Sequence, residues 1–139
     1  MRDHMPYVVA YIGTAIVFFA IDYIWLSRVA FGFYREQIGH VLLDQPNLAA
    51  AGAFYLFYIG GIVYFAVAPA MQSGNWTQAL IAGAVLGLVA YGTYDMTNLA
   101  TIRNWSVSVT IIDILWGAAL TGTAATAGYF ATRLLGTGN

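Results

Sequence analysis

Three aspartates stand inside apolar segments of this sequence, and they could do chemistry there. Asp22 and Asp113 each precede a tryptophan by three positions, in "IDYIW" and "IDILW", and Asp95 ends the run "YGTYD". A carboxyl group among apolar residues can act as an acid or base, hold a cation, or accept hydrogen bonds that fix helix packing. Because burial of a carboxyl group costs free energy, each aspartate is a candidate for a functional role.

The residue types that are missing limit this chemistry. The chain has no cysteine and no lysine, which excludes thiolate nucleophiles, cysteine-bound zinc and lysine Schiff bases. Its two histidines, His4 and His40, lie outside the apolar segments, which argues against a haem held between helices. We therefore expect no cofactor. Aspartate oxygens suit Mg²⁺ or Ca²⁺, but we expect no metal site, because the paired-aspartate motifs of lipid phosphotransferases are absent.

The segments that carry the aspartates are long enough to cross a membrane. The chain is 60% hydrophobic and 8% charged, whereas a soluble domain carries about 25% charged residues. A helix needs roughly 20 apolar residues to cross the hydrocarbon core. Four runs reach this length: Pro6–Leu26, Leu48–Pro69, Trp76–Asn98 and Val107–Ala131. Since they do not alternate in polarity as barrel strands do, the sequence predicts an all-α membrane protein, with four transmembrane helices in an antiparallel bundle.

The connections between these runs indicate a single four-span domain covering residues 1–139. The second and third connections, residues 70–75 and 99–106, are short, so consecutive helices should be antiparallel neighbours. The first connection, residues 27–47, contains "FGFYREQIGHVLLDQPN", which has the pattern of a short amphipathic helix lying in the membrane interface. An ordinary connector is the alternative.

The antiparallel arrangement predicts that the three aspartates share one layer. Asp22 and Asp95 lie about one turn before the ends of their spans, and Asp113 lies about two turns into its own span. The first and third spans end on the side where the second and fourth begin. All three carboxyl groups should therefore lie in one half of the membrane, where mutual repulsion should keep at least one of them protonated.

Other polar and aromatic residues should gather in the same layer. We expect Tyr55, Tyr58, Tyr91 and Asn98 to supply hydrogen bonds to the aspartates. Arg103 should lie near the mouth, and Trp116 should lie deeper than Trp25. The candidate ligand-binding residues are Asp22, Tyr55, Tyr58, Tyr91, Asp95, Asn98, Arg103, Asp113 and Trp116, and the candidate catalytic residues are Asp95, Asp113 and Asp22.

The stretch "YGTYDMTNLATIRNW" (Tyr91–Trp105), together with "IDYIWL", "FYLFYIGG" and "DILWG", resembles the uncharacterised bacterial membrane protein family known as domain of unknown function 2177. The likeness covers nearly the whole chain, with no departure at the matching positions. It implies a four-helix protein of the bacterial inner membrane. It brings no known reaction, cofactor or catalytic residue, so the function has to be argued from the residues.

Three functions fit these residues, and membrane lipids are the expected partners in each setting, with no nucleic acid. The first is an integral membrane protein that binds or moves a lipid or small amphiphile in a polar and aromatic pocket. The second is a small membrane enzyme, in which Asp95 or Asp113 acts as general acid or base on lipid head groups. The third is an assembly subunit, in which the polar layer only specifies packing with itself or with a partner. We favour the first. Separately, the alternative for the aspartates is a purely structural role as staples that fix helix register, and the alternative for most tryptophans is an interfacial belt.

The arginines give a narrow signal for orientation. Arg28, Arg35 and Arg103 belong to the first and third connections, whereas Arg2 and Arg133 lie on the opposite side. The positive-inside rule then places these connections in the cytoplasm and both termini outside.

Small residues in the spans predict close helix contacts. Gly83 and Gly87 should pack within the chain. In the fourth span a second stripe is suited to contact with another copy, and it predicts a homodimer. This stripe consists of Gly117, Thr121, Ala124 and Gly128.

Overall fold

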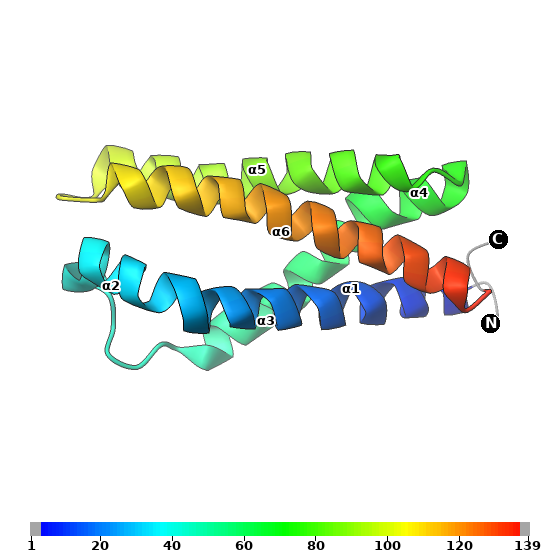
Figure 1. The fold of residues 1–139 in the computed structure, drawn as a ribbon, viewed down its shortest axis with the longest axis horizontal. Coiled ribbons are helices and arrows are strands. Elements are labelled where there is room, and N and C mark those ends of the chain that lie inside the picture. The colour runs from blue at the N-terminus through cyan, green and yellow to red at the C-terminus, as the bar shows by residue number, and fades with distance from the viewer. Residues whose placement is uncertain (1–3, 137–139) are drawn as a thin grey trace.

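Four long helices form a bundle in the computed structural model of the chain, which describes residues 4–136 (Figure 1). No strand occurs within this part of the chain. The helices that are long and apolar enough to cross a membrane are Met5–Val41, Leu48–Ser73, Trp76–Thr101 and Val107–Leu134. The last three begin at the predicted residues, where Asn47, Asn75 and Ser106 cap the backbone with side-chain oxygens. The predicted all-α membrane bundle is confirmed.

The first long helix continues through the segment predicted as a connection. It consists of α1 (Met5–Ile24), the π-helical turn η1 (Trp25–Ala30), α2 (Phe31–Ile38) and the short 3₁₀ turn η2 (Gly39–Val41). The predicted short helix is present as α2, but it prolongs α1 instead of forming a separate element (Figure 1). Arg2, which enters the orientation prediction, lies outside the described residues.

The π-helical turn keeps one face of this long helix toward the bundle. The backbone N–H of Phe31 bonds to the carbonyl of Leu26, five positions back, so the turn is wider than an α-helical turn. Inward-facing residues recur every four positions from Asp22 to Ile38. On an ideal α-helix this spacing drifts by about 40° per step. The wide turn takes up part of that drift, and it brings α2 over the start of α6.

The second long helix crosses the bundle obliquely. It consists of α3 (Leu48–Ile62), the π-helical turn η3 (Val63–Val67) and α4 (Ala68–Ser73). Pro69 has no N–H to bond the carbonyl of Phe65, and the wide turn lies directly before it. α3 lies beside α1, whereas η3 and α4 pack on α5 (Figure 1). The two ends of this helix therefore have different neighbours.

Helices α5 (Trp76–Thr101) and α6 (Val107–Leu134) form the closest pair in the bundle. Glycine makes this approach possible. A Cβ atom added at Gly87 would collide with the backbone of Gly117, and one added at Gly83 would come within 2.9 Å of the Ala125 side chain. The predicted packing of these two glycines within the chain is confirmed.

The small-residue stripe of α6 is used inside the chain. Gly117 lies under the ring of Tyr91, Gly128 lies against Thr14 of α1, and Thr121 and Ala124 are fully buried. The prediction that this stripe contacts a second copy is therefore wrong. The homodimer stays a prediction, and it has no assigned surface.

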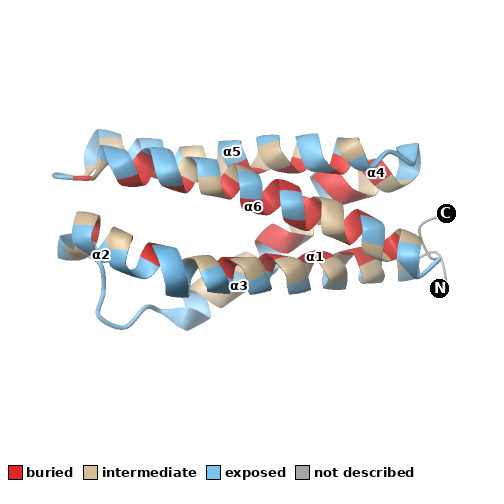
Figure 2. Ribbon diagram, viewed as in Figure 1, coloured by how far each residue is buried: buried red, intermediate tan, exposed pale blue. Residues whose placement is uncertain are grey.

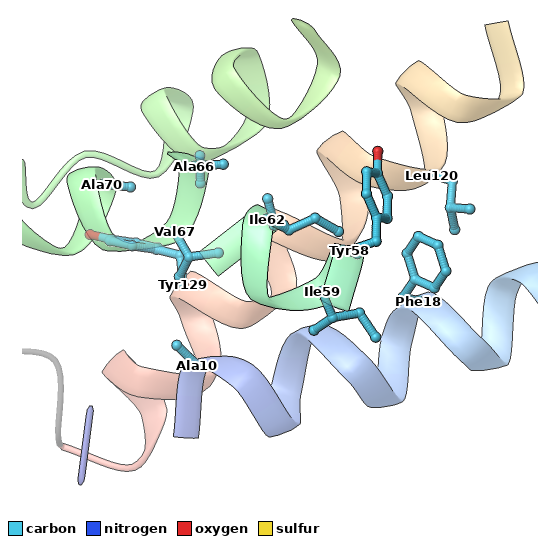
Figure 3. Close-up of a cluster of buried hydrophobic side chains, with 13 residues drawn as sticks. Ala10, Phe18, Tyr58, Ile59, Ile62, Ala66, Val67, Ala70, Leu120 and Tyr129 are labelled. Carbon is cyan, nitrogen blue, oxygen red and sulfur yellow. The ribbon is translucent and has the colours of Figure 1, made fainter. Parts of the chain in front are cut away.

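The hydrophobic core extends from the middle of the bundle toward the end where α1 begins and α6 ends. Its buried side chains come from all four long helices, with Phe18, Tyr58 and Leu120 at one side of the cluster (Figure 3). The outer faces of the helices are exposed (Figure 2). They carry large apolar side chains, such as Phe57, which is 77% exposed. Such outer faces suit contact with lipid rather than with water. The aspartates lie beyond the core, at the other end.

Candidate functional site

A pocket with a volume of about 610 Å³ lies at the end of the bundle that holds the aspartates. All four long helices contribute to its wall. The lining residues are Asp22, Trp25, Leu26, Tyr34, Ile38, Leu42, Ala51, Phe54, Tyr55, Tyr58, Ala90, Tyr91, Thr93, Tyr94, Asp95, Thr97, Trp105, Val109, Asp113 and Trp116. Most of them are aromatic or aliphatic, and the aspartates are the only charged residues in the set.

The structure brings the three aspartates to this one pocket. Asp22 comes from α1, Asp95 from α5 and Asp113 from α6, with exposed fractions of 7%, 0% and 9%. None of the three points into the surroundings of the bundle. The shared layer that span boundaries and antiparallel helices predict is therefore present in the fold.

The repeated aspartate–tryptophan spacing joins α1 to α6. The indole nitrogen of Trp116 donates a hydrogen bond of 3.1 Å to Oδ1 of Asp22. The ring of Trp116 stacks on that of Trp25, with 4.3 Å between the ring centroids and 8° between the planes. Each motif thus contributes a tryptophan to one stacked pair, and the tryptophan of one motif serves the aspartate of the other.

The second motif aspartate is paired across the pocket with α2. The hydroxyl of Tyr34 donates a short hydrogen bond to Oδ1 of Asp113. Nearby, the hydroxyl of Ser106 donates to the side-chain oxygen of Gln37 at 2.8 Å. The prolonged first helix therefore supplies both the apolar and the hydrogen-bonding contacts that hold it against the start of α6.

Two buried polar groups on the pocket wall have unused hydrogen-bonding capacity. Neither carboxyl oxygen of Asp95 accepts a hydrogen bond from an N–H or hydroxyl donor of the described residues, although the residue is completely buried. The carboxyl group of Asp113 lies within hydrogen-bonding range of Asp95, and a bond between two carboxyl groups requires a shared proton. The indole N–H of Trp105, 8% exposed, has no acceptor among the described residues. Since buried polar groups in folded proteins almost always have partners, the Asp95–Asp113 pair and this N–H are the groups on the wall that a ligand could complement.

The pocket opens to the surface of the bundle. Three of its lining residues are about half exposed: Phe54 at 58%, Tyr94 at 55% and Leu26 at 47%. Phe54 lies on α3 and Tyr94 on α5, two helices whose backbones are well separated, although the rings of Tyr58 and Tyr91 meet between them with 6.4 Å between centroids. The exposed side chains on both helices mark where the pocket wall reaches the surface of the bundle.

Seven of the nine predicted ligand-binding residues line this pocket. Asn98 and Arg103 do not. Asn98 lies on the same helix face, beside Tyr94, and reaches the pocket only through that residue. Arg103 is exposed in the turn between α5 and α6, and no ion pair between it and an aspartate occurs in the described part of the chain. A basic residue at the pocket is therefore not observed.

The hydrogen-bond donors differ from those predicted. Asp22 and Asp113 receive their hydrogen bonds from Trp116 and Tyr34, whereas the tyrosines of α3 and α5 were expected to donate. Tyr58 shares a hydrogen bond of 2.8 Å with Thr121, so its hydroxyl is engaged within the core. Tyr91 lies over Gly117 and forms part of the wall through its ring.

Sequence reasoning missed several lining residues, including Tyr34, Tyr94 and Trp105. Tyr34 falls in the segment that the sequence predicts as a connection, so the predicted spans do not relate its position to Asp113. One sequence pattern could have located it. The inward-facing residues repeat every four positions past the predicted end of the span, which indicates that the helix continues: Asp22, Leu26, Ala30, Tyr34 and Ile38.

The pocket does not have the form of a metal centre. Within residues 4–136, no three histidine, cysteine, aspartate or glutamate side chains are grouped so that they could hold a metal ion. Asp22 and Asp113 are each occupied by a donor from a tryptophan or tyrosine. Hydrogen-bond acceptors and aromatic rings surround the pocket, and this arrangement suits an organic ligand.

Comparison with known proteins gives one match. A family model described as "Predicted membrane protein (DUF2177)" matches residues 7–130. The matched region contains every residue that lines the pocket. No curated protein and no solved structure matches the chain.

Proposed function

The chain belongs to the predicted membrane protein family DUF2177, and from this premise we propose that it binds an amphiphile of the bilayer in its aromatic, aspartate-lined pocket. The observation that carries the proposal is the pocket itself, with a volume of about 610 Å³ and half-exposed wall residues on α3 and α5. Ligand sites typically have volumes of roughly 300–1,000 Å³, with mostly apolar walls and a few convergent polar groups.

The position of the polar groups indicates how an amphiphile lies. Asp95 and Asp113 come from α5 and α6, which pack together at the inner wall. Phe54 and Tyr94 stand at the opening with about half of their surfaces exposed. A head group therefore lies inward at the carboxyl groups, and an apolar tail leaves between α3 and α5. The ligand exchanges with the bilayer through this opening without crossing the bundle.

An experiment with pocket-filling variants tests this proposal. Protein purified in a mild detergent is analysed by native mass spectrometry and lipid extraction. Ala90 lines the pocket, whereas Ala100 is an exposed residue of the same helix. We expect wild type and Ala100→Phe to retain one lipid per chain, and Ala90→Phe to lose it.

Two results would overturn amphiphile binding: absence of any bound lipid from wild type, or equal retention by Ala90→Phe with unchanged thermal stability. Should Ala90→Phe fail to fold, a second pair on α3 replaces it. Ala51 lines the pocket and Ala53 is exposed outside it. Ala51→Phe should lose the lipid and Ala53→Phe should keep it.

Catalysis is a second candidate, and one observation favours it. Asp95 and Asp113 are neighbouring carboxyl groups whose environments differ, since Asp113 accepts a hydrogen bond from the Tyr34 hydroxyl, whereas Asp95 accepts none from an N–H or hydroxyl donor of the described residues. In enzymes, two carboxyl groups in different environments can take separate roles, one as the acid and the other as the base. Turnover of lipids by the purified protein, abolished by Asp95→Asn, would establish an enzyme. Binding without turnover would leave the amphiphile-binding function alone.

The cellular setting extends the same proposal. We infer a bacterial inner membrane from the family likeness, and termini outside the cytoplasm from the distribution of arginines. A homodimer would need a face other than the buried small-residue stripe of α6.

A further inference from the structure

We infer that the pocket selects amphiphiles whose head group carries a protonated amine beside a hydrogen-bond acceptor. The inference rests on the proposed function, because it names the head group of the ligand that the pocket binds. It comes from the charges on the wall and from the buried polar groups with unused hydrogen-bonding capacity.

The charges on the pocket wall are all of one sign. Asp22, Asp95 and Asp113 line it, and neither an arginine nor a histidine is among the lining residues. The chain contains no lysine. The wall therefore offers carboxyl groups and no basic side chain to a head group. A phosphate or carboxylate head group without a cation would find no basic partner here, so the pocket discriminates against purely anionic amphiphiles.

The groups with unused hydrogen-bonding capacity define the complementary ligand more closely. Asp95 is completely buried and faces the Asp113 carboxyl group, and neither of its oxygens accepts from an N–H or hydroxyl donor of the described residues. A protonated amine would supply such a donor to this carboxyl pair. Trp105 has a buried indole N–H without an acceptor, which an adjacent hydroxyl, ester or phosphate oxygen supplies. The two groups lie on the same pocket wall but on different segments, α5 and the turn before α6. One head group with both features satisfies both.

The aromatic residues support the same class of ligand. Tyr55, Tyr91 and Tyr94 line the pocket together with the stacked pair of Trp25 and Trp116. Faces of such rings attract ammonium groups. The carboxyl groups and the aromatic rings around the pocket therefore both attract a cation. Neither attracts an anion.

A series of ligands with one tail and different heads tests the inference on the full-length protein. Trp76→Phe serves as the background, because it leaves only Trp25, Trp105 and Trp116, all of which line the pocket. Their fluorescence is titrated with dodecylamine, dodecanol and dodecanoate in detergent near neutral pH. We expect the amine to bind roughly tenfold more tightly than the alcohol, as a charged hydrogen bond allows. Dodecanoate should bind most weakly.

Matched variants then assign the selectivity to Asp95 and Trp105. Asp95→Asn should reduce the affinity for the amine to that for the alcohol, while Asp44→Asn, the same change in the exposed connection, should leave it unaltered. An amino alcohol of equal tail length should bind more tightly than dodecylamine, and Trp105→Phe should remove that difference.

The outcomes separate this inference from the proposed function. Equal affinities of the Trp76→Phe background protein for amine and alcohol, or preference for dodecanoate, would overturn the head-group inference and leave amphiphile binding standing. A failure of all ligands to change the fluorescence would contradict both. The ligands are compared on the Trp76→Phe protein, which has no substitution in the pocket. The inference can therefore be refuted even if Asp95→Asn does not fold.

Discussion

The indole nitrogen of Trp116 donates a hydrogen bond of 3.1 Å to the carboxyl group of Asp22, across the interface between α6 and α1. This pairing accounts for the repeated aspartate–tryptophan spacing. Trp25 and Trp116, one from each motif, stack on each other and hold the two helices together beside the pocket. The motifs are thus parts of one interhelical contact.

Loss of the Trp116 donor should destabilise the fold. Trp116→Phe leaves Asp22 buried without this partner, and an unsatisfied buried acceptor costs about 1–3 kcal/mol. Trp76→Phe is the matched control, since Trp76 is 45% exposed and remote from the pocket. Unfolding in detergent should begin at a lower denaturant concentration for Trp116→Phe than for the control. Coincident unfolding curves would show that this contact does not stabilise the bundle.

The hydrogen bond from Tyr34 should hold α2 against α6. Tyr34→Phe removes only the hydroxyl, so we expect a loss of about 1 kcal/mol and faster amide exchange in α2. Tyr23, 71% exposed on α1, provides the same substitution without a pocket contact. Hydrogen exchange followed by mass spectrometry distinguishes the two variants. Unchanged protection of α2 in Tyr34→Phe would mean that apolar packing alone fixes this helix.

Close contact between α5 and α6 should make Gly87 intolerant of any side chain. In Gly87→Ala the new methyl group would collide with the backbone of Gly117, and overpacking of this kind costs about 1–3 kcal/mol. A Cβ atom added at Gly92, on the same helix, would meet no atom within 4 Å apart from its own stretch of helix. Gly92→Ala should therefore be neutral or stabilising through helix propensity. Equal stability of the two variants in urea titrations would contradict the described packing of α5 on α6.

Orientation can be read with reporters fused to the C-terminus. The arginine distribution predicts that alkaline phosphatase fused there is active outside the cytoplasm and that a green fluorescent protein fusion is dark. A fluorescent fusion with inactive phosphatase would reverse the orientation and place the pocket in the outer half of the membrane.

Hydropathy and span boundaries were sufficient to predict four helices and the convergence of Asp22, Asp95 and Asp113, because long apolar runs and antiparallel neighbours leave few arrangements. The partner of Asp113 could not be predicted in the same way. Tyr34 reaches it only because a π-helical turn prolongs α1, and such a turn depends on packing against α6 rather than on local sequence. Similarly, the stripe from Gly117 to Gly128 has the same pattern whether it faces another copy or, as here, α1 and α5.

The central claim is that the pocket holds an amphiphile with its head at Asp95 and its tail between α3 and α5. An experimental structure of the protein crystallised from a lipid mesophase tests this most directly. The account predicts continuous non-protein density that begins within hydrogen-bonding distance of the Asp95 carboxyl group and leaves past Phe54 and Tyr94. A structure in which α3 closes against α5, or in which the pocket is formed but contains no elongated density, would contradict it.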